Sequence, residues 1–110
     1  MGGKASRRKG HDFEREIAAQ LREIGLEARR GQQGGGAVEP DVITQGWWIE
    51  CKVGKRPNIT AAIDQAVRDL KRAPTRPDTT VPVAIVKQDY KTATVTMRLN
   101  DWLDLLEGIR

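Results

Sequence analysis

The segment from Trp47 to Val53 gives the strongest structural signal in the sequence, because its side chains alternate in character. A β-strand points successive side chains to opposite faces of its sheet. One face of this strand is wholly apolar and suits burial; it consists of Trp47, Ile49, Cys51 and Val53. The opposite face carries Trp48, Glu50 and Lys52. An acid and a base two residues apart on one face therefore need an explanation.

A second strand is expected just before, over Glu39–Ile43, joined through a tight turn at residues 44–46. This hairpin lets Asp41 and Glu50 face the same ion, and paired carboxylates suit Mg²⁺, which prefers oxygen ligands. The backbone carbonyl of Cys51 is a candidate further ligand. Lys52 shares the face of Glu50 and is placed to orient a water or to stabilise charge on a phosphate. Glu14, from the first predicted helix, is a candidate metal ligand or water-positioning group.

Each of these signals has an ordinary interpretation when taken alone. Glu50 and Lys52 by themselves are typical of a solvated ion pair on an exposed sheet face. Pro40-Asp41 is a turn signal, and a lone glutamate such as Glu14 is usually a surface residue of a helix. The set in this order and spacing is more specific than any member.

Apolar periodicity predicts the other elements. A helix begins at about Asp12, buries Phe13 and Ile17, and ends at Gly25. The remaining expectations are a short strand over residues 26–30, a glycine-rich loop over 31–36, a helix over 60–72 capped by Thr60, a loop over 73–80, strands over 81–86 and 92–97, and a last helix capped by Asn100. The apolar residues of the last helix predict core contacts together with a dimer interface, with core alone as the alternative; they are Trp102, Leu103, Leu105, Leu106 and Ile109.

The 110 residues suit one domain, and the net charge of +4 is unevenly distributed. Residues 1–10 are predicted to form a flexible basic arm, and 11–110 a single domain. The arm holds Lys4, Arg7, Arg8 and Lys9, which favours a polyanion such as nucleic acid, with a solubilising terminus as the alternative. One cysteine and one histidine argue against a disulfide framework and a structural zinc site. No apolar run is long enough to span a membrane, and a cytoplasmic location is expected.

Glu14, Pro40-Asp41 and Glu50-Cys51-Lys52 together resemble the PD-(D/E)xK nuclease superfamily, and within it the archaeal-type and phage Holliday junction resolvases. The further matching residues are Lys9-Gly10, Glu14-Arg15-Glu16, Gly25, Arg29 or Arg30, Ile49 and Gln65. The resemblance extends over about residues 9–70. The loop over 31–36 departs from the pattern, since it has no serine.

The resemblance implies an α/β (α+β) fold of the restriction-endonuclease type, with three layers, a central mixed sheet of about five strands, and the order αβββαββα. It implies a Mg²⁺- or Mn²⁺-dependent DNA endonuclease that acts on four-way junctions as a homodimer, in a prokaryotic or virus-infected cell. The implied catalytic residues are Glu14, Asp41, Glu50 and Lys52, with the metal held by Asp41, Glu50, the Cys51 carbonyl and Glu14. The expected DNA contacts are Lys4, Arg7, Arg8, Lys9, Arg15, Arg29 or Arg30, Lys55 and Arg56, with Gln65 as an accessory residue.

Two other functions remain open at this point. One is a structure-specific or nicking nuclease of the virus-type replication-repair group. The other is a DNA-binding module of the same fold without catalysis. The gathered acids argue against the second, because like charges near DNA weaken binding unless a metal is present.

Overall fold

The computed structural model describes residues 3–32, 38–73 and 77–109. Residues 33–36 of the predicted glycine loop, residues 74–76 of the predicted loop over 73–80, and the first two residues of the predicted arm lie outside this description. The elements are α1 (Gly3–Glu23), β1 (Arg29–Arg30), β2 (Val42–Thr44), β3 (Trp47–Gly54), α2 (Ile59–Arg72), β4 (Val81–Gln88), β5 (Thr94–Thr96) and α3 (Leu99–Ile109). This is the predicted order αβββαββα.

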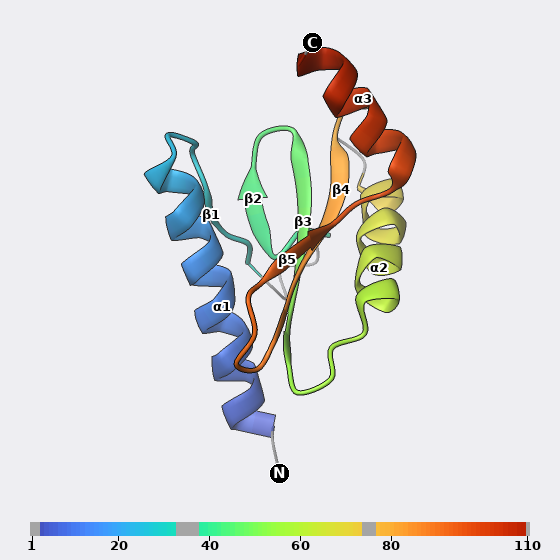
Figure 1. Cartoon of the computed structure of the whole chain (residues 1–110). Helices are drawn as coiled ribbons and strands as arrows, with labels where there is room; N and C mark the ends of the chain where they lie inside the picture. Colours follow the sequence, from blue (N-terminus) through green and yellow to red (C-terminus); the bar gives the residue numbers. More distant parts are fainter. Residues whose placement is uncertain (1–2, 33–37, 74–76, 110) are drawn as a thin grey trace.

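The five strands form one mixed sheet in the order β1-β2-β3-β4-β5. Only β3 and β4 run parallel, and α2 is the crossover between them. The other neighbours pair antiparallel. Helices α1 and α2 cover opposite faces of the sheet (Figure 1). The three-layer α+β fold expected from the sequence is therefore confirmed.

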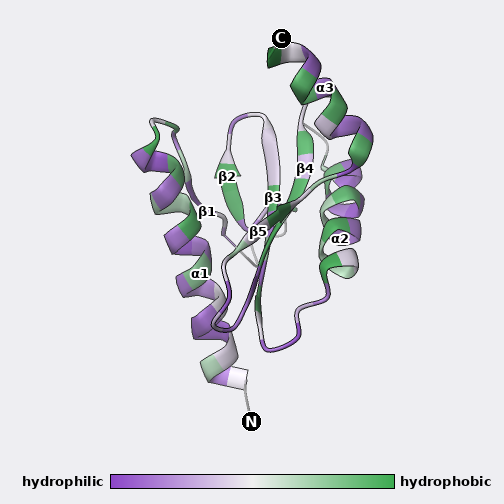
Figure 2. Ribbon diagram, in the orientation of Figure 1, coloured by the Kyte–Doolittle hydropathy of each residue, from purple (hydrophilic) through white to green (hydrophobic). Residues whose placement is uncertain are grey.

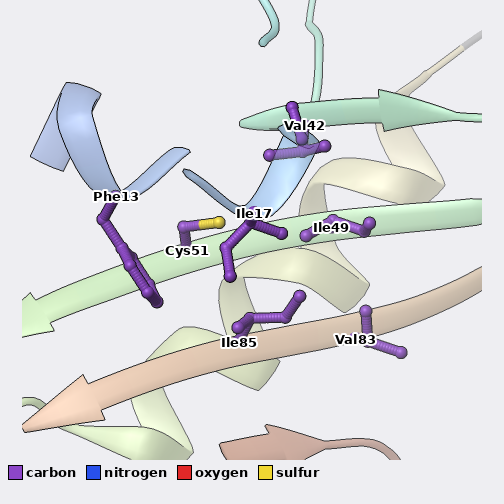
Figure 3. Packing of buried hydrophobic residues seen from close by; sticks show 8 residues of the cluster. Phe13, Ile17, Val42, Ile49, Cys51, Val83 and Ile85 are labelled. Atoms are coloured by element: carbon purple, nitrogen blue, oxygen red, sulfur yellow. The ribbon is translucent and has the colours of Figure 1, made fainter. Parts of the chain in front are cut away.

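The larger part of the core lies between α1 and the sheet (Figure 3). Phe13 and Ile17 of α1 pack onto Val42, Ile49 and Cys51 and onto β4. Ile49 and Cys51 belong to the apolar face predicted from the alternation along β3. Burying each such side chain stabilises the fold by about 1.5–3 kcal/mol relative to its exposure. The strands that carry the candidate site are thus anchored to the core through their opposite face.

The α2 face of the sheet is closed by small residues. Ala62 of α2 packs against Ala84 and Val86 of β4 in a compact second cluster. Trp48 points to the same side as Glu50 because they are two residues apart, and its exposed area is 0 %. Trp48 is therefore a packing residue of this layer.

Three predicted boundaries are wrong in an informative way. Helix α1 begins at Gly3 and not at Asp12, so residues 3–10 form its first turns. Asn58, not Thr60, caps α2: its side chain accepts a hydrogen bond from the Ala61 N–H at 2.9 Å. Asn100 lies inside α3, which begins at Leu99. Several neighbouring residues near a helix start can act as its cap, so a boundary that is predicted from sequence is easily wrong by one or two residues.

Helix α3 has no buried residue, although its sequence is rich in leucine. It follows the edge strand β5 and extends beyond the rest of the fold, with hydrophobic segments along its length (Figures 1 and 2). Its exposed apolar side chains are Leu99, Trp102, Leu103, Leu105, Leu106 and Ile109. The expectation that this helix supplies core contacts is therefore wrong within the single chain.

Among the described residues, no helix has the length and apolar character needed to cross a membrane.

Candidate functional site

The pairing of β2 with β3 brings Asp41 and Glu50 together. Val42 is paired with Ile49, so the preceding Asp41 lies opposite Glu50. The Asp41 N–H donates to the Ile49 carbonyl at 2.9 Å, which continues the ladder by one residue. Residues opposite each other on antiparallel strands share a sheet face, and here it is the face toward α2. The two predicted metal-binding carboxylates are thus neighbours.

The backbone around Asp41 fixes its carboxylate. The Cys51 N–H donates to Asp41 Oδ2 at 2.8 Å, which sets the direction of the side chain. The Gly31 N–H donates to the Asp41 carbonyl at 2.8 Å from the other side. These two contacts, from β3 and from the end of β1, were not predicted from the sequence.

Gly31 can only be glycine in this arrangement. A Cβ built on Gly31 would lie 2.0 Å from the carbonyl oxygen of Pro40, an approach that no real side chain tolerates. The run of glycines after Arg30 was interpreted as a flexible loop, but its first member is buried and closely packed. Gly31 therefore acts as a positioning residue for Asp41.

Replacing Gly31 by alanine is expected to displace Pro40 and Asp41 and to lower both stability and cleavage. Overpacking of this kind costs typically about 1–3 kcal/mol, and the shift acts directly on a carboxylate of the site. Thermal unfolding and junction cleavage should be measured together. Gly10→Ala is the matched control: its added Cβ meets no atom within 4 Å, and alanine favours the interior of α1. Unchanged cleavage by the Gly31 variant would contradict this role.

The two carboxyl groups repel each other and are poorly solvated. Burial, with the nearby Asp41 and then Asp69, raises the pKa of Glu50 to about 8. Burial likewise raises the pKa of Asp41, and the charge of Glu14 adds to this effect. Lys52 lowers both pKa values but does not outweigh burial. The pair therefore retains a proton near neutral pH unless another cation compensates the second charge.

Glu14 is buried on the other side of the sheet. Its Oε1 accepts from Arg30 Nε at 2.8 Å, and Arg30 is paired with Val42, whose side chain faces α1. The charge of Glu14 nevertheless acts on Asp41, whose pKa it raises. Within residues 3–32, 38–73 and 77–109, no three acidic, histidine or cysteine side chains are gathered closely enough to hold a metal together. The structure thus brings together the predicted pair, with Glu14 engaged by Arg30.

Helix α2 adds a residue that the sequence interpretation missed. The negative charge of Asp69 raises the pKa of Glu50 and so acts on the site. The spacing Ala62, Ala66, Asp69 was the available signal, since these positions share one side of a helix. Gln65, the predicted accessory residue, is half-buried on the same helix.

Comparison with known families assigns the chain to a class of nucleases. The family model of the archaeal Holliday junction resolvase (Hjc) matches residues 5–72, which is more than half of the chain. The chain belongs to the archaeal Holliday junction resolvase family. The resemblance found in the sequence is confirmed, and the chain is a nuclease of the junction-resolving class. Resolvase nucleases of this class use a divalent metal ion and bind branched DNA.

A solved structure supports the same fold. The Holliday junction resolvase Hjc of Archaeoglobus fulgidus superposes with a TM-score of 0.57 at 18 % sequence identity, covering 80 % of this chain and 76 % of that chain. At this identity the likeness concerns the fold alone. No curated protein has a matching sequence.

The donor set of the resolvase site fits a hard divalent cation. Asp41 and Glu50 provide carboxylate oxygens from facing strands, and Glu50 is only 6 % exposed. Mg²⁺ is commonly held by one or two carboxylates, with waters and substrate phosphate completing its shell. The Cys51 thiol is buried and its pKa is raised, first by burial, so it stays protonated and is a poor ligand. Its backbone remains the part that serves the site.

The predicted DNA-binding residues fall into three groups. Lys4, Arg7, Arg8 and Lys9 are exposed on the first turns of α1. Lys55 and Arg56 are exposed in the turn between β3 and α2. The other three are engaged by the protein: Arg15 pairs with Asp12 at 3.0 Å, Arg30 with Glu14, and Arg29 donates to the Arg30 carbonyl at 3.4 Å. Of the first group, Lys9 also has a protein partner, Asp89.

Proposed function

We propose that this resolvase cuts four-way DNA junctions with a Mg²⁺ or Mn²⁺ ion held by Asp41, Glu50 and the Cys51 carbonyl. The observation that carries the proposal is the pairing of half-buried Asp41 with buried Glu50, with Lys52 next to Glu50 on the same face. Two neighbouring acids with raised pKa values destabilise the fold when both are charged. A divalent cation bound between them would compensate both charges and also attract a phosphate. A metal bound here would lower the pKa of its water and stabilise charge on the phosphate.

The chain's own residues supply the other steps. The Cys51 N–H holds the Asp41 carboxylate in one orientation. Lys52 is exposed, so its ammonium group can reach the scissile phosphate, orient the attacking water, and stabilise the charge that develops as the water oxygen bonds to phosphorus and the opposite oxygen leaves. Glu14, held by Arg30, adds negative charge beside Asp41 and positions the water shell of the site.

The test is cleavage of five DNA substrates, with Mg²⁺ and with EDTA. They are a four-way junction, a fork, a nicked duplex, an intact duplex and a single strand. Paired symmetric cuts in the junction, abolished by EDTA, are the expected result. Equal cutting of all five would favour the nicking or replication-repair nuclease, and binding without cutting in Mg²⁺ or Mn²⁺ would favour the non-catalytic module.

We further propose that the resolvase acts as a homodimer in the cytoplasm of a prokaryotic or virus-infected cell, with α3 as its interface. Symmetric cuts need two sites, and one chain offers a single Asp41–Glu50 pair among its described residues. The exposed apolar residues of α3 form a surface that a monomer rarely leaves open. A second copy would cover the same helix reciprocally, as two-fold interfaces do. The single cysteine, which is buried, suits a reducing compartment.

Leu103→Glu is expected to convert the dimer into a monomer without unfolding the chain. Leu103 is exposed on α3, and glutamate is a good helix former, so only the interface should suffer. The dimer dissociation constant should rise at least about tenfold, since a charge would be buried against apolar residues. Sedimentation velocity over a concentration series measures this. Glu107→Gln, an exposed polar change on the same helix, is the control, and a Leu103 variant that stays dimeric would move the interface elsewhere.

A further inference from the structure

Tyr90 is an aromatic residue with an unusual setting. It lies in the turn between β4 and β5, and its side chain is fully exposed. Its φ angle is +65°, a left-handed conformation that bulky residues rarely adopt. Neither feature helps the fold: the ring buries nothing, and glycine or asparagine would suit the backbone better. A residue kept under these conditions invites a functional explanation.

The turn that presents Tyr90 is held from three directions. The Asp89 N–H donates to the Gly54 carbonyl at 2.9 Å, and the Lys91 N–H donates to the Gln88 carbonyl at 2.9 Å. The Asp89 carboxylate also pairs with the ammonium group of Lys9 from α1. Figure 1 shows this turn beside the first half of α1. The ring is therefore offered to solvent from a fixed backbone, so little ordering entropy opposes its contact with a ligand.

The surroundings of Tyr90 suit a nucleic-acid backbone. A groove begins next to the turn, and its lining combines two cations with neutral polar and apolar residues and includes no acid: Arg56, Lys91, Gln88, Thr92, Thr94, Pro57, Ile59 and Val86. Lysine, arginine and threonine are the side chains that commonly contact phosphates. An exposed aromatic beside a cationic groove is the arrangement by which proteins bind unpaired bases, with the ring stacking on the base and the cations following the strand.

The turn is also close to the catalytic face. Gly54 at the end of β3 is paired with Gln88, and Lys52 lies two residues before Gly54 on the same strand. Asp89 and Tyr90 follow Gln88 directly, so the turn continues β4 beyond the level of Gly54, at the end of the sheet toward which β3 runs after Lys52. A DNA strand that is bound at Lys52 and runs toward this end of the sheet would bring its bases to the turn.

We propose that Tyr90 stacks on a base exposed at the branch point of the junction, while Arg56 and Lys91 contact the phosphates beside it. This inference rests on the proposed function and deepens it, because it names how branched DNA is distinguished from duplex. In a continuous duplex every base is already stacked, and unstacking one costs free energy. At a branch point the stack is interrupted, so the ring of Tyr90 gains a partner there at lower cost.

The test compares Tyr90→Asn and Tyr90→Phe with the wild-type protein, using DNA that carries 2-aminopurine at the branch point in EDTA. Asparagine tolerates a positive φ, so Tyr90→Asn should melt at the same temperature as the wild type or higher while losing the ring. It should bind the junction about tenfold more weakly or worse, bind duplex as before, and lose the fluorescence change of the branch-point base. Tyr90→Phe keeps the ring and should restore both signals.

Salt dependence separates stacking from charge. Tyr90→Asn should lower affinity equally at every salt concentration, whereas Lys91→Ala should reduce the slope of log K against log salt by about 1. Unchanged junction affinity in Tyr90→Asn, or an equal loss in Tyr90→Phe, would overturn the stacking role. The proposed function fails differently: ring-dependent junction binding by a wild-type protein that never cuts would contradict catalysis and leave the stacking intact.

Discussion

Replacing Asp41 by asparagine is expected to abolish junction cleavage while leaving junction binding intact or tighter. Asparagine keeps an oxygen that can accept the Cys51 N–H, so the local backbone should hold. It removes one of the two charges that a divalent cation requires, and the cleavage rate should fall on the order of a thousandfold or more. Binding should persist because the lost charge had repelled the phosphates. Single-turnover cleavage and gel-shift titration of the same junction measure the two effects.

A matched control distinguishes the site from general charge. Glu23→Gln makes a similar carboxylate-to-amide change at an exposed residue at the end of α1, and it should leave cleavage within about twofold of the wild type, since isolated surface changes have small effects. Appreciable cleavage by the Asp41 variant, with Mg²⁺ or Mn²⁺, would show that the metal is held elsewhere.

The sequence was most informative where alternation decides the geometry. The period of two along β3 separated Ile49 and Cys51 from Glu50 and Lys52 without any knowledge of the neighbours. The expected hairpin let Asp41 and Glu50 face the same ion, and the observed register places them opposite each other. Both depend on local backbone geometry, which a sequence pattern records directly.

The parts that could not be predicted depend on contacts between distant segments. Gly31 looks like any glycine of a loop until Pro40 is placed against it. Asp69 shares a helix side with Ala62 and Ala66, but its effect on Glu50 arises from how α2 docks on the sheet, which that spacing does not reveal. The engagement of Glu14 by Arg30 likewise follows from the approach of α1 to β1. Long-range packing of this kind leaves no periodicity in the sequence.

Helix α3 shows a different limit of sequence interpretation. Its apolar residues predict burial, but a sequence cannot say whether the cover is the chain's own core or another molecule. The described part of the chain covers α3 only partly, since none of the helix's residues is buried. The same hydrophobic pattern that stabilises a core in one protein forms an interface in another.

The metal-free resolvase is expected to lose stability as the pH rises from about 5 to 8, and Glu50→Gln should remove much of this loss. Glu50 has an ordinary pKa of 4.5 in the unfolded chain and a raised one of about 8 in the folded protein. Between these values the folded state retains a proton that the unfolded chain releases. The free energy of unfolding therefore falls with pH, by up to about 1.4 kcal/mol per pH unit for one full proton. The raised pKa of Asp41 acts in the same direction.

Thermal unfolding in EDTA at pH 5, 6, 7 and 8 measures this dependence for both proteins. At pH 5 the wild-type Glu50 is protonated when folded, so the wild type and the glutamine variant should differ little in stability. At pH 8 the variant should be more stable, on the order of 1–3 kcal/mol, because its neutral amide can donate to Asp41. Addition of Mg²⁺ at pH 8 should then raise the wild-type melting temperature far more than that of the variant, since only the wild type has both charges. Parallel pH profiles for the two proteins would mean that Glu50 titrates normally and that the acids are not a strained pair awaiting a cation. In that case any loss of folding stability caused by the site would have to arise from residues outside β3.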